Sequence, residues 1–501
     1  MAVRFCHHFL GGVIYKEESV KQENGRRGGG DFMGNMSADA KAFIRKQRVS
    51  FGAVEFGSKM LPLLTAAGMM SYMMEDTDIS GYAARVIMIS GLAAALLAAF
   101  FISPVIDRTR KKSGRSKSWI YTGIILVAVS TLMSVYVPHA AAKIEIVYVG
   151  IVFFVWCFGV RLLLCPADAL LAGMAQNAAE RTNLASVKGF AGGLAVICAG
   201  WMAGGLTAPE LHGTDGGRKY VMVFTAVILI SMLLGSAFLK ETYLPPVPDG
   251  QRMSLKEYGE DLKAFFKDRY FGLLLLYGGI LMFGTSVFST LSGGHAHWIL
   301  GEPENAALVK VITYGVPLAA YLAVPFLAGK MTKRQCAVLG TAVYAGACLL
   351  MLISIKVLPV YYLALIVAEL GNGFLWAMLW AMEPDVFDHV DHLTGRARAV
   401  FPLTVISAAI AAGAGFAGVV RQSLTVFAAN LGSPAGTAAQ MSGRNSFMVF
   451  GFILIPLAVC GVLAFVLRFY KLDVEFPEIR RELDRRYAGE ENPTGYGTKT
   501  I

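Results

Sequence analysis

The sequence predicts an all-α polytopic membrane protein with twelve membrane-spanning helices, and three properties of its composition support this fold class. Of its 501 residues, 55% are hydrophobic and only 16% are charged, against about 25% charged residues in an average soluble protein. The mean hydropathy is +0.55, and the 54 glycines suit helices that pack closely within a bilayer. A soluble protein of this length needs a much larger charged surface, so the composition excludes a water-soluble multidomain enzyme.

Twelve apolar runs divide the chain, and each is long enough to cross a hydrocarbon core about 30 Å thick as a helix. Several contain Gly or Pro, which membrane helices tolerate because neighbouring helices satisfy the freed backbone groups. The predicted spans are Phe51–Met73, Tyr82–Ile106, Trp119–Val137, Ile144–Leu164, Leu184–Leu206, Tyr220–Phe238, Tyr270–Ile299, Ala306–Ala328, Cys336–Ile355, Leu358–Met382, Val400–Ala428 and Phe447–Phe469.

The charges between these runs orient the chain in the membrane. Lys and Arg gather in the loop between runs two and three, Arg108 to Lys117, and in the loops before runs seven and nine, whereas residues 75–81 contain neither. Because Lys and Arg are enriched in cytoplasmic loops, we expect both termini and the long central loop in the cytoplasm. The net charge of +10 therefore reflects membrane orientation and not a nucleic-acid partner.

The two halves of the chain are alike. In each half the second helix ends in a short basic loop, and the fourth is followed by an acidic residue and then an arginine: Glu180-Arg181 early and Asp391 to Arg396 late. Six helices, a central loop and six more helices form the parallel repeat of the major facilitator architecture, whose substrate site lies at mid-membrane between two pseudo-symmetric six-helix bundles. The predicted segments are 1–46, a disordered cytoplasmic tail; 47–242, the first bundle; 243–268, a central cytoplasmic loop; 269–472, the second bundle; and 473–501, a cytoplasmic tail.

One family combines these features. The segment Asp107 to Trp119 resembles the loop between helices two and three of the glycoside–pentoside–hexuronide:cation symporters, the melibiose-carrier branch of the major facilitator superfamily. The resemblance runs from about Ser50 to Arg486 and implies an inner-membrane carrier of sugars or related glycosides. The other matching stretches, in order, are Phe56-Gly57, Cys165-Pro166, Glu180 to Leu184, Glu383 to Asp388, Thr394 to Arg396 and Tyr470 to Leu472.

Several positions depart from the pattern of this family. Members that couple to sodium or protons carry two carboxylates one turn apart in helix two, and these positions fall on Ala95 and Ala99. The polar residue that helix four adds to the same cation site is Arg161 here, and the sugar-binding carboxylate of helix one falls at Lys59. The resemblance thus implies that the usual cation-coupling carboxylates are absent. We expect a uniporter, an exchanger, or coupling through other acids.

Five charged side chains in or next to the apolar runs of the first half are candidate functional residues, because an isolated charge at the bilayer centre costs about 2.5–3.5 kcal/mol and is usually paired or in contact with water. Glu55 and Lys59 are four residues apart, so either they form a local ion pair or Lys59 faces the central cavity and binds an anionic group. Arg161 and Asp168 lie two turns apart on one face. They either form a structural pair between helices, or Arg161 takes the electrostatic place of the bound cation. Lys188 either lines the same site or extends toward the cytoplasmic interface.

These charges predict the class of solute. Lys59, Arg161 and Lys188 give the first half an excess of positive charge, which attracts carboxylate, sulfonate or phosphate. We therefore expect a secondary transporter of an anionic, hexuronide-like sugar that works by alternating access. Trp376 and Trp380 are candidate platforms for the sugar ring, although such residues also serve as interfacial anchors. The alternatives are a Na⁺- or H⁺-coupled symporter of neutral glycosides and a carrier of an amphiphile or lysolipid.

Charged residues near the cytoplasmic ends of the helices are candidates for gating. By the family resemblance, Asp385 and Asp388 form an acidic cluster that pairs with basic residues of other loops when the carrier is open to the outside. Asp107 and its basic loop are expected to play the matching role in the first half. Ion pairs that break and form again provide the bistable element that alternating access requires. The basic candidates are Arg110, Arg115, Arg181 and Arg396.

The sequence indicates neither an enzyme nor a cofactor or metal site. It contains no HExxH, no GxSxG and no nucleotide-binding loop, and its seven cysteines form no CxxC pair. His389 and His392 share a helical face with the gating acids, a spacing that would also suit a divalent metal. The expected partners are a small solute, membrane lipid and a coupling ion, Na⁺ or H⁺, held by acids such as Asp168 or Glu369.

Overall fold

Helices make up all the regular structure in the part of the chain that the computed structural model describes. The described residues are 38–69, 81–109, 114–138, 142–174, 178–206, 210–211, 214–241, 255–298, 306–328, 330–353, 357–395, 398–430 and 450–489. No strand occurs among them, as the all-α prediction requires. The gating candidates Arg110 and Arg396 lie outside the described residues.

The first half of the chain provides six transmembrane helices. The first begins at Ala38, so residues 38–46, which were expected in the N-terminal tail, are helical. The second is built from three pieces, because Pro104 has no N–H to donate to the preceding turn, and a π turn stands directly before it. The elements are α2 (Ala38–Met69), α3 (Gly81–Leu97), η2 (Ala98–Ile102), α4 (Ser103–Arg108), α5 (Lys117–Val135), α6 (Ala142–Met174), α7 (Ala178–Leu206) and α8 (Asp215–Phe238).

The second half provides the other six, with an additional helix on either side. An amphipathic helix lies in the central loop, and a helix at the C-terminal end covers much of the segment expected as a tail. The fourth and tenth transmembrane helices continue past the predicted ends Leu164 and Met382, because the prolines there stay within the helix. The elements are α9 (Leu255–Lys267), α10 (Arg269–Trp298), α11 (Ala306–Ala328), α12 (Lys333–Ile353), α13 (Leu358–Thr394), α14 (Val400–Asn430), η4 (Phe450–Leu454), α16 (Ile455–Phe469) and α17 (Leu472–Gly489).

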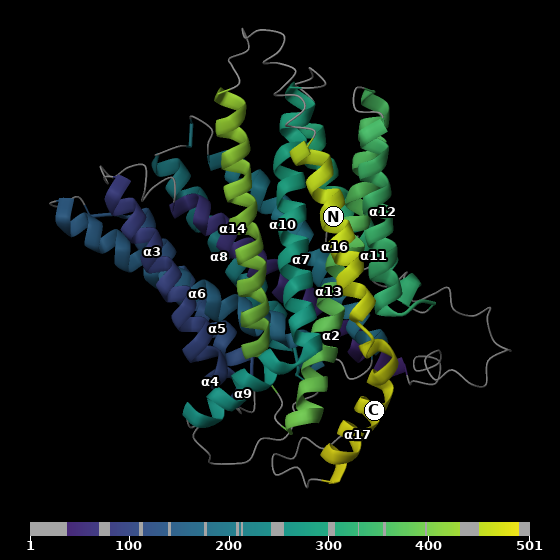
Figure 1. Ribbon diagram of the computed structural model, residues 1–501. Helices are drawn as coiled ribbons and strands as arrows, with labels where there is room; N and C mark the ends of the chain where they lie inside the picture. Colours follow the sequence, from purple (N-terminus) through teal and green to yellow (C-terminus); the bar gives the residue numbers. More distant parts are fainter. Residues whose placement is uncertain are drawn as a thin grey trace.

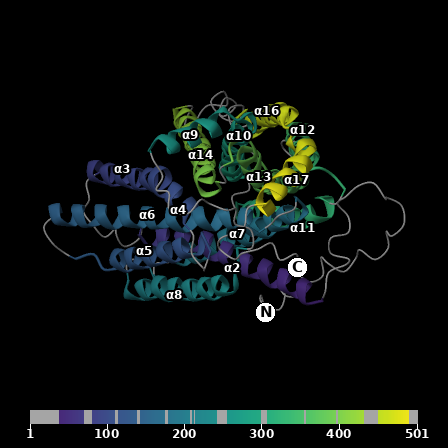
Figure 2. The same ribbon diagram turned by 90° about the horizontal axis from the view of Figure 1, so that it is seen from below.

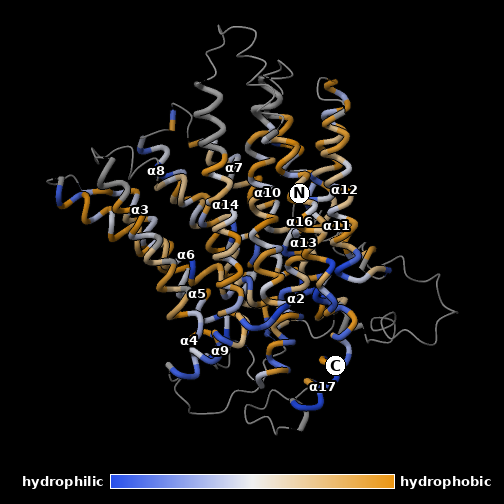
Figure 3. The backbone as a smooth tube through the Cα atoms, in the orientation of Figure 1, coloured by the Kyte–Doolittle hydropathy of each residue, from blue (hydrophilic) through white to orange (hydrophobic). Residues whose placement is uncertain are grey.

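The length and polarity of the helices fit a bilayer. Among the described residues, ten helices are long and apolar enough to cross a membrane. The first transmembrane helix, α2, carries Glu55 and Lys59 at its centre, and the second has only 17 residues before its π turn; these two complete the twelve. Apolar side chains such as Trp201, which is 76% exposed, face outward. Figure 3 shows that hydrophobic residues predominate through the middle of the molecule and that hydrophilic residues are frequent in α9 and α17.

The two bundles lie side by side and have separate cores, one built mainly on α2 to α8 and the other on α10 to α17 (Figure 2). They meet where α7 packs against α11 and α13. Gly189 and Gly193 of α7 allow this close approach, because an added Cβ would lie 2.6 Å from Tyr321 and 2.7 Å from Leu318 of α11. Small residues four apart bring membrane helices into contact in this way.

The contacts between the halves concentrate at one end of the molecule. This end, here called the closed end, carries α4, α9 and α17, and toward the opposite end α3 and α6 lean away from α10 and α14 (Figure 1). The ion pairs of Arg181 with Asp385 and Asp388, which join the two halves, lie at the closed end. The two halves therefore meet at the closed end and diverge toward the opposite end.

Candidate transport site and gate

Three charged side chains from three helices of the first half meet inside the bundle. The carboxylate of Asp168, in α6, accepts hydrogen bonds from the ammonium groups of Lys59 in α2, at 2.8 Å, and Lys188 in α7, at 2.9 Å. The side chain of Lys188 is 4% exposed, whereas those of Asp168 and Lys59 are 15% and 27% exposed. This set, here called the lysine–aspartate cluster, carries a net charge of +1.

The local pair between Glu55 and Lys59, one of the two interpretations of their spacing, does not form a hydrogen bond. Lys59 instead reaches Asp168, 109 positions along the chain. It can do so because α2 packs against both α6 and α7, with Gly192 of α7 beside the Lys59 side chain. Glu55 is fully buried, and neither of its carboxylate oxygens has a hydrogen-bond partner among the described residues.

Arg161 lies on the same face of α6 as Asp168, about 10 Å farther from the closed end along a helix that rises 1.5 Å per residue. The two do not pair with each other; Asp168 instead pairs with Lys59 and Lys188 of two other helices. Within the described part of the chain, no hydrogen bond or ion pair to Arg161 occurs, and its side chain is half-buried. A guanidinium in this position is available to a carboxylate, sulfonate or phosphate.

The second half contributes aromatic rings beside the cluster. The ring of Trp380, in α13, lies 5.5 Å from the Lys188 ammonium, a distance typical of a cation–π contact. Trp376 lies one turn earlier, with its ring centroid 5.7 Å from that of Trp380, and Tyr321 of α11 lies 5.8 Å away on another side. Both tryptophans are half-buried. Lys188 of one half thus faces an aromatic group of the other.

A network of charged side chains joins the halves at the closed end. The guanidinium of Arg181, at the start of α7, donates to Asp385 at 2.9 Å and to Asp388 at 2.7 Å, both in α13. Lys333 of α12 pairs with the other oxygen of Asp385. Arg181 is completely buried, so its charge depends on these two carboxylates. This network, here called the gate, is the main electrostatic connection between α7 and α13.

Asp107 makes the second connection, in a different way. Its buried carboxylate, at the end of α4, accepts hydrogen bonds from the backbone N–H groups of Ala399, Val400 and Phe401 at 3.0, 2.9 and 2.8 Å. These N–H groups lie at the start of α14. The carboxylate of one half therefore caps a helix of the other half, at the end where the helix dipole favours negative charge. Arg115, from the basic loop, lies 3.4 Å from the same carboxylate.

The comparisons with known proteins place the chain in a family. A sequence model described as MFS/sugar transport protein matches residues 50–474. The chain belongs to this family. It is 24% identical over 459 residues to the isoprimeverose transporter of Lactiplantibacillus pentosus, and the aligned region covers 89% of this chain and 92% of that one. It is 23% identical to a glucuronide carrier protein homolog of Escherichia coli K12, over 82% of this chain and 90% of that one.

A third relative is named a putative sulfoquinovose importer of Salmonella typhimurium LT2; it is 20% identical over 70% of this chain and 74% of that one. Solved structures share the fold at lower identity. The E. coli fucose:proton symporter FucP superposes with a TM-score of 0.58 at 15% identity, over 84% of this chain and 98% of that one. The proton:xylose symporter XylE gives 0.53 at 14%, over 89% and 99%.

These findings confirm the glycoside–pentoside–hexuronide resemblance and the major facilitator fold with twelve helices. The chain of this MFS/sugar transport family is a multi-pass membrane protein and a secondary transporter of a sugar- or glycoside-type solute; it is not an enzyme. The charge of that solute and the coupling ion belong to the proposals below.

Sequence reasoning missed two basic residues whose ion pairs hold α9 and α17 at the closed end of this sugar transporter. Arg480 of α17 donates to Asp388 at 3.0 Å, and Arg398, just before α14, pairs with Asp261 of α9 at 2.9 Å. Burial raises the pKa of Asp473, while the backbone N–H of Arg334, which donates to it at 2.7 Å, opposes that shift. The amphipathic pattern of both segments was the available signal.

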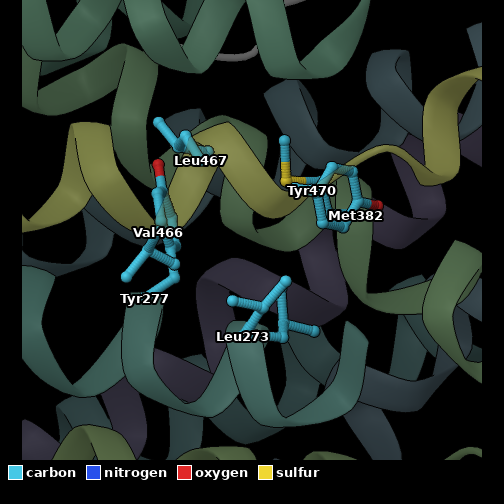
Figure 4. Close-up of a pocket in the computed structure, with 7 residues that line it drawn as sticks. Leu273, Tyr277, Met382, Val466, Leu467 and Tyr470 are labelled. Carbon is cyan, nitrogen blue, oxygen red and sulfur yellow. The ribbon is translucent and has the colours of Figure 1, made fainter. Parts of the chain in front are cut away.

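Two further features do not form part of the transport site. Figure 4 shows a pocket lined by apolar and tyrosine side chains of α10, α13 and the end of α16, with no charged group that would bind an anion. No group of three His, Cys, Asp or Glu suited to a metal occurs among the described residues. His389, a candidate ligand by spacing, instead lies 3.0 Å from Asp268.

Proposed function

We propose that this transporter carries an anionic, hexuronide-like sugar by alternating access, and that Arg161 binds the anionic group of the solute. The observation that carries the proposal is the guanidinium of Arg161, which has no hydrogen-bond or ion-pair partner among the described residues and lies two turns from a cluster that is itself positive. The charges add to +2 when Lys59, Lys188 and Arg161 are set against Asp168. A site with this excess of positive charge binds a carboxylate or sulfonate, whereas a neutral sugar would leave the positive charge of the site without a counter-ion.

The names of the relatives support an acidic sugar without requiring it. One is named a glucuronide carrier homolog and another a putative sulfoquinovose importer; a glucuronide bears a carboxylate and sulfoquinovose a sulfonate. A third is named for isoprimeverose, which is neutral. A neutral glycoside is therefore the alternative that the experiment must separate.

Sodium is not needed at the lysine–aspartate cluster. Asp168 accepts hydrogen bonds from two tethered ammonium groups, which fill the role that a bound cation plays beside a carboxylate. Positions 95 and 99, where the family carries its cation-binding carboxylates, are alanine. A sodium ion beside Lys59 and Lys188 would meet two positive charges within a few ångströms, an arrangement that costs free energy at low dielectric.

The gate supports the alternating-access part of the proposal. We place the closed end in the cytoplasm, because α4, the start of α5, α9 and α17 lie at this end and carry or adjoin basic residues such as Arg108, Arg115 and Lys117. The conformation is then open to the outside. Arg181 must leave Asp385 and Asp388, and Asp107 must leave the start of α14, before the solute can reach the cytoplasm.

The test is a ligand screen that follows thermal unfolding of the purified protein, using methyl β-D-glucuronide, sulfoquinovose, glucose 6-phosphate and methyl β-D-glucoside, with and without sodium. We expect stabilisation by an acidic sugar, independent of sodium; at a ligand concentration of about 100 Kd it amounts to about 2.7 kcal/mol. Arg161→Gln should abolish it. Arg218→Gln, which alters a surface pair with Asp215, is the matched control. Stabilisation only by the neutral glucoside, strengthened by sodium, contradicts the proposal.

A further inference from the structure

The outer face of α9, the amphipathic helix of the central loop, has no role in the transport site or the gate. Its other face packs on the second half. There Asp261 pairs with Arg398 at 2.9 Å, and the ring centroid of Phe265 lies 6.1 Å from that of Phe401 at the start of α14. Asp261 and Phe265 are both buried. The helix is therefore held from one side, and its opposite side is left for a different partner.

Exposed lysines run along this outer face. Lys256, Lys263 and Lys267 are all exposed, and their spacings of seven and four residues place them on one side of a helix with 3.6 residues per turn. Glu260 is exposed among them, so the four side chains carry a net charge of +2. This set of three lysines is here called the lysine row. It faces away from the side of α9 that packs on α14.

An aromatic side chain borders the lysine row. Phe266 is 57% exposed, and the helical spacing places it between Lys263 and the buried side of α9. Its ring centroid lies 6.1 Å from that of Phe271 in α10. An amphipathic helix that lies in the membrane interface has lysines on its polar face and Phe or Leu on its apolar face. The outer part of α9 has this arrangement.

The position of α9 fits the surface of a bilayer. Only Asp268 separates α9 from α10, a helix long and apolar enough to cross a membrane. The last residues of α9, Phe266 and Lys267, are therefore at the level where α10 leaves the hydrocarbon core. Figures 1 and 2 show α9 lying across the closed end, beside α14 at the edge of the second bundle. Lysines at this depth lie among lipid headgroups.

We propose that the lysine row of α9 binds the headgroups of anionic phospholipids in the leaflet at the closed end. Each ammonium group offers three donors to phosphate oxygens, and an anionic headgroup supplies the negative charge that the row lacks. Because Asp261 and Phe265 already fix α9 on the second bundle, the lysines are held in place before the lipid binds, and little of the chain has to be ordered. The proposal does not depend on the solute that the protein carries.

The C-terminal helix α17 shows that a basic outer face is not a general property of helices at the closed end. It also lies at this end (Figure 1) and is amphipathic, but the exposed charges of α17 and the residue before it cancel, because three are positive and three are negative. An anionic surface gains little from such a face. These exposed side chains are Lys471, Glu478, Arg481, Glu482, Asp484 and Arg485.

The first measurement is native mass spectrometry of the purified protein, titrated with dioleoyl phosphatidylglycerol or dioleoyl phosphatidylcholine. We expect wild type to bind phosphatidylglycerol more tightly. In the triple variant Lys256→Gln, Lys263→Gln, Lys267→Gln, this affinity should fall about fivefold for each lysine removed, because a basic residue near an anionic membrane surface contributes about 1 kcal/mol. Binding of phosphatidylcholine should not change. Equal affinity of wild type and the triple variant for phosphatidylglycerol overturns the proposal.

Two further triple variants serve as controls. The first removes three charges from α17 at the same end, by Lys471→Gln, Arg481→Gln and Arg485→Gln, and should keep the affinity for phosphatidylglycerol. The second replaces the three lysines of the row by arginine and should also keep it, because the charge is retained; this separates loss of charge from damage to α9. An equal loss of affinity in the α17 variant would assign the attraction to the total charge of the closed end, against the proposal.

A competition experiment separates the lipid from a free anion. Inorganic phosphate, added to wild type at the same concentration as phosphatidylglycerol, should not displace the lipid, because it has no acyl chains that remain in the bilayer or micelle beside Phe266. Displacement by inorganic phosphate would mean that the lysine row is a site for a soluble anion, and the proposal of a lipid surface would then be wrong.

The second measurement locates the lipid. Gly259 is exposed on the outer face, and an added Cβ there meets no atom within 4 Å, so Gly259→Cys can carry a fluorescent label. After subtraction of the signal of labelled wild type, the label should be quenched more by phosphatidylglycerol with a nitroxide on its acyl chain than by the matching phosphatidylcholine. In 1 M NaCl, where the Debye length is about 3 Å, the difference should disappear. A label at Glu478→Cys on α17 should show no difference. Equal quenching by both lipids at Gly259→Cys contradicts the proposal.

Discussion

The lysine–aspartate cluster and the gate are both networks of buried acidic and basic side chains, but the cluster lies within one bundle and the gate joins the two bundles. Lys59, Asp168 and Lys188 belong to one bundle, so their bonds can survive a rocking movement of the two bundles. The gate joins Arg181 of one bundle to Asp385 and Asp388 of the other, so its bonds must break in such a movement. The first network therefore contributes to the stability of a half, and the second to the balance between states.

The largest effect should follow from removal of the shared acid of the cluster. Asp168→Asn leaves Lys59 and Lys188 without their counter-ion, and loss of one partner of a buried pair costs about 3–5 kcal/mol. We expect the free energy of unfolding to fall by that amount, measured by denaturant or thermal unfolding in detergent. Asp215→Asn, which alters a surface pair with Arg218, should have no measurable effect. Equal small changes in both variants would show that the cluster is not a structural unit.

The helices and bundles could be predicted from the sequence, but the partners of the charged residues buried in both networks could not. Hydropathy and loop charge were enough to predict twelve helices in two bundles, because each membrane-spanning helix needs a run of apolar residues that is visible in its own sequence. The partners of buried charges were not predictable. The spacing of Glu55 and Lys59 allowed either a local pair or a Lys59 that faces the central cavity, but the packing of α2 against α6 and α7 gave Lys59 a partner 109 positions away.

The contacts at the closed end were also only partly predictable from the sequence. The sequence placed Arg181, Asp385 and Asp388 at the ends of helices, and the structure brings them together. It gave no sign that Asp107 would meet backbone N–H groups of α14, since a helix start has no distinctive residue to match. Nor did it indicate that Arg480 would reach Asp388, because the docking of α17 depends on tertiary contacts.

A smaller effect, on the balance of states, should follow from a change in the gate. Asp385→Asn weakens the hydrogen bonds to Arg181 and Lys333, and a bond to a charged group is worth about 1.5–3 kcal/mol. The unfolding midpoint should change little, whereas the closed end should open more often. Spin labels at the exposed positions Ala179 and Leu393, on α7 and α13, report this as a longer distance between them.

Two controls separate the gate from general damage. Arg181→Gln combined with Asp385→Asn should open the closed end less than the sum of the single variants, because the two residues share one interaction. Glu475→Gln, which alters an exposed pair with Arg269 at the same end but within one half, should leave the distance unchanged. Additive single effects would show that Arg181 and Asp385 do not act as one gate.

The smallest of the three effects belongs to Asp107, and it distinguishes a helix cap from an ion pair. Asp107→Asn keeps a side chain of the same size but loses the charge that faces the start of α14, an interaction worth about 1–2 kcal/mol at a buried helix end. The same pair of labels should show an increase in the open population that is smaller than in Asp385→Asn. Arg115→Gln should have less effect again, since Arg115 lies 3.4 Å from a carboxylate that three backbone N–H groups already satisfy. An equal response to Arg115→Gln and Asp107→Asn would mean that the ion pair, and not the cap on α14, holds this side of the closed end.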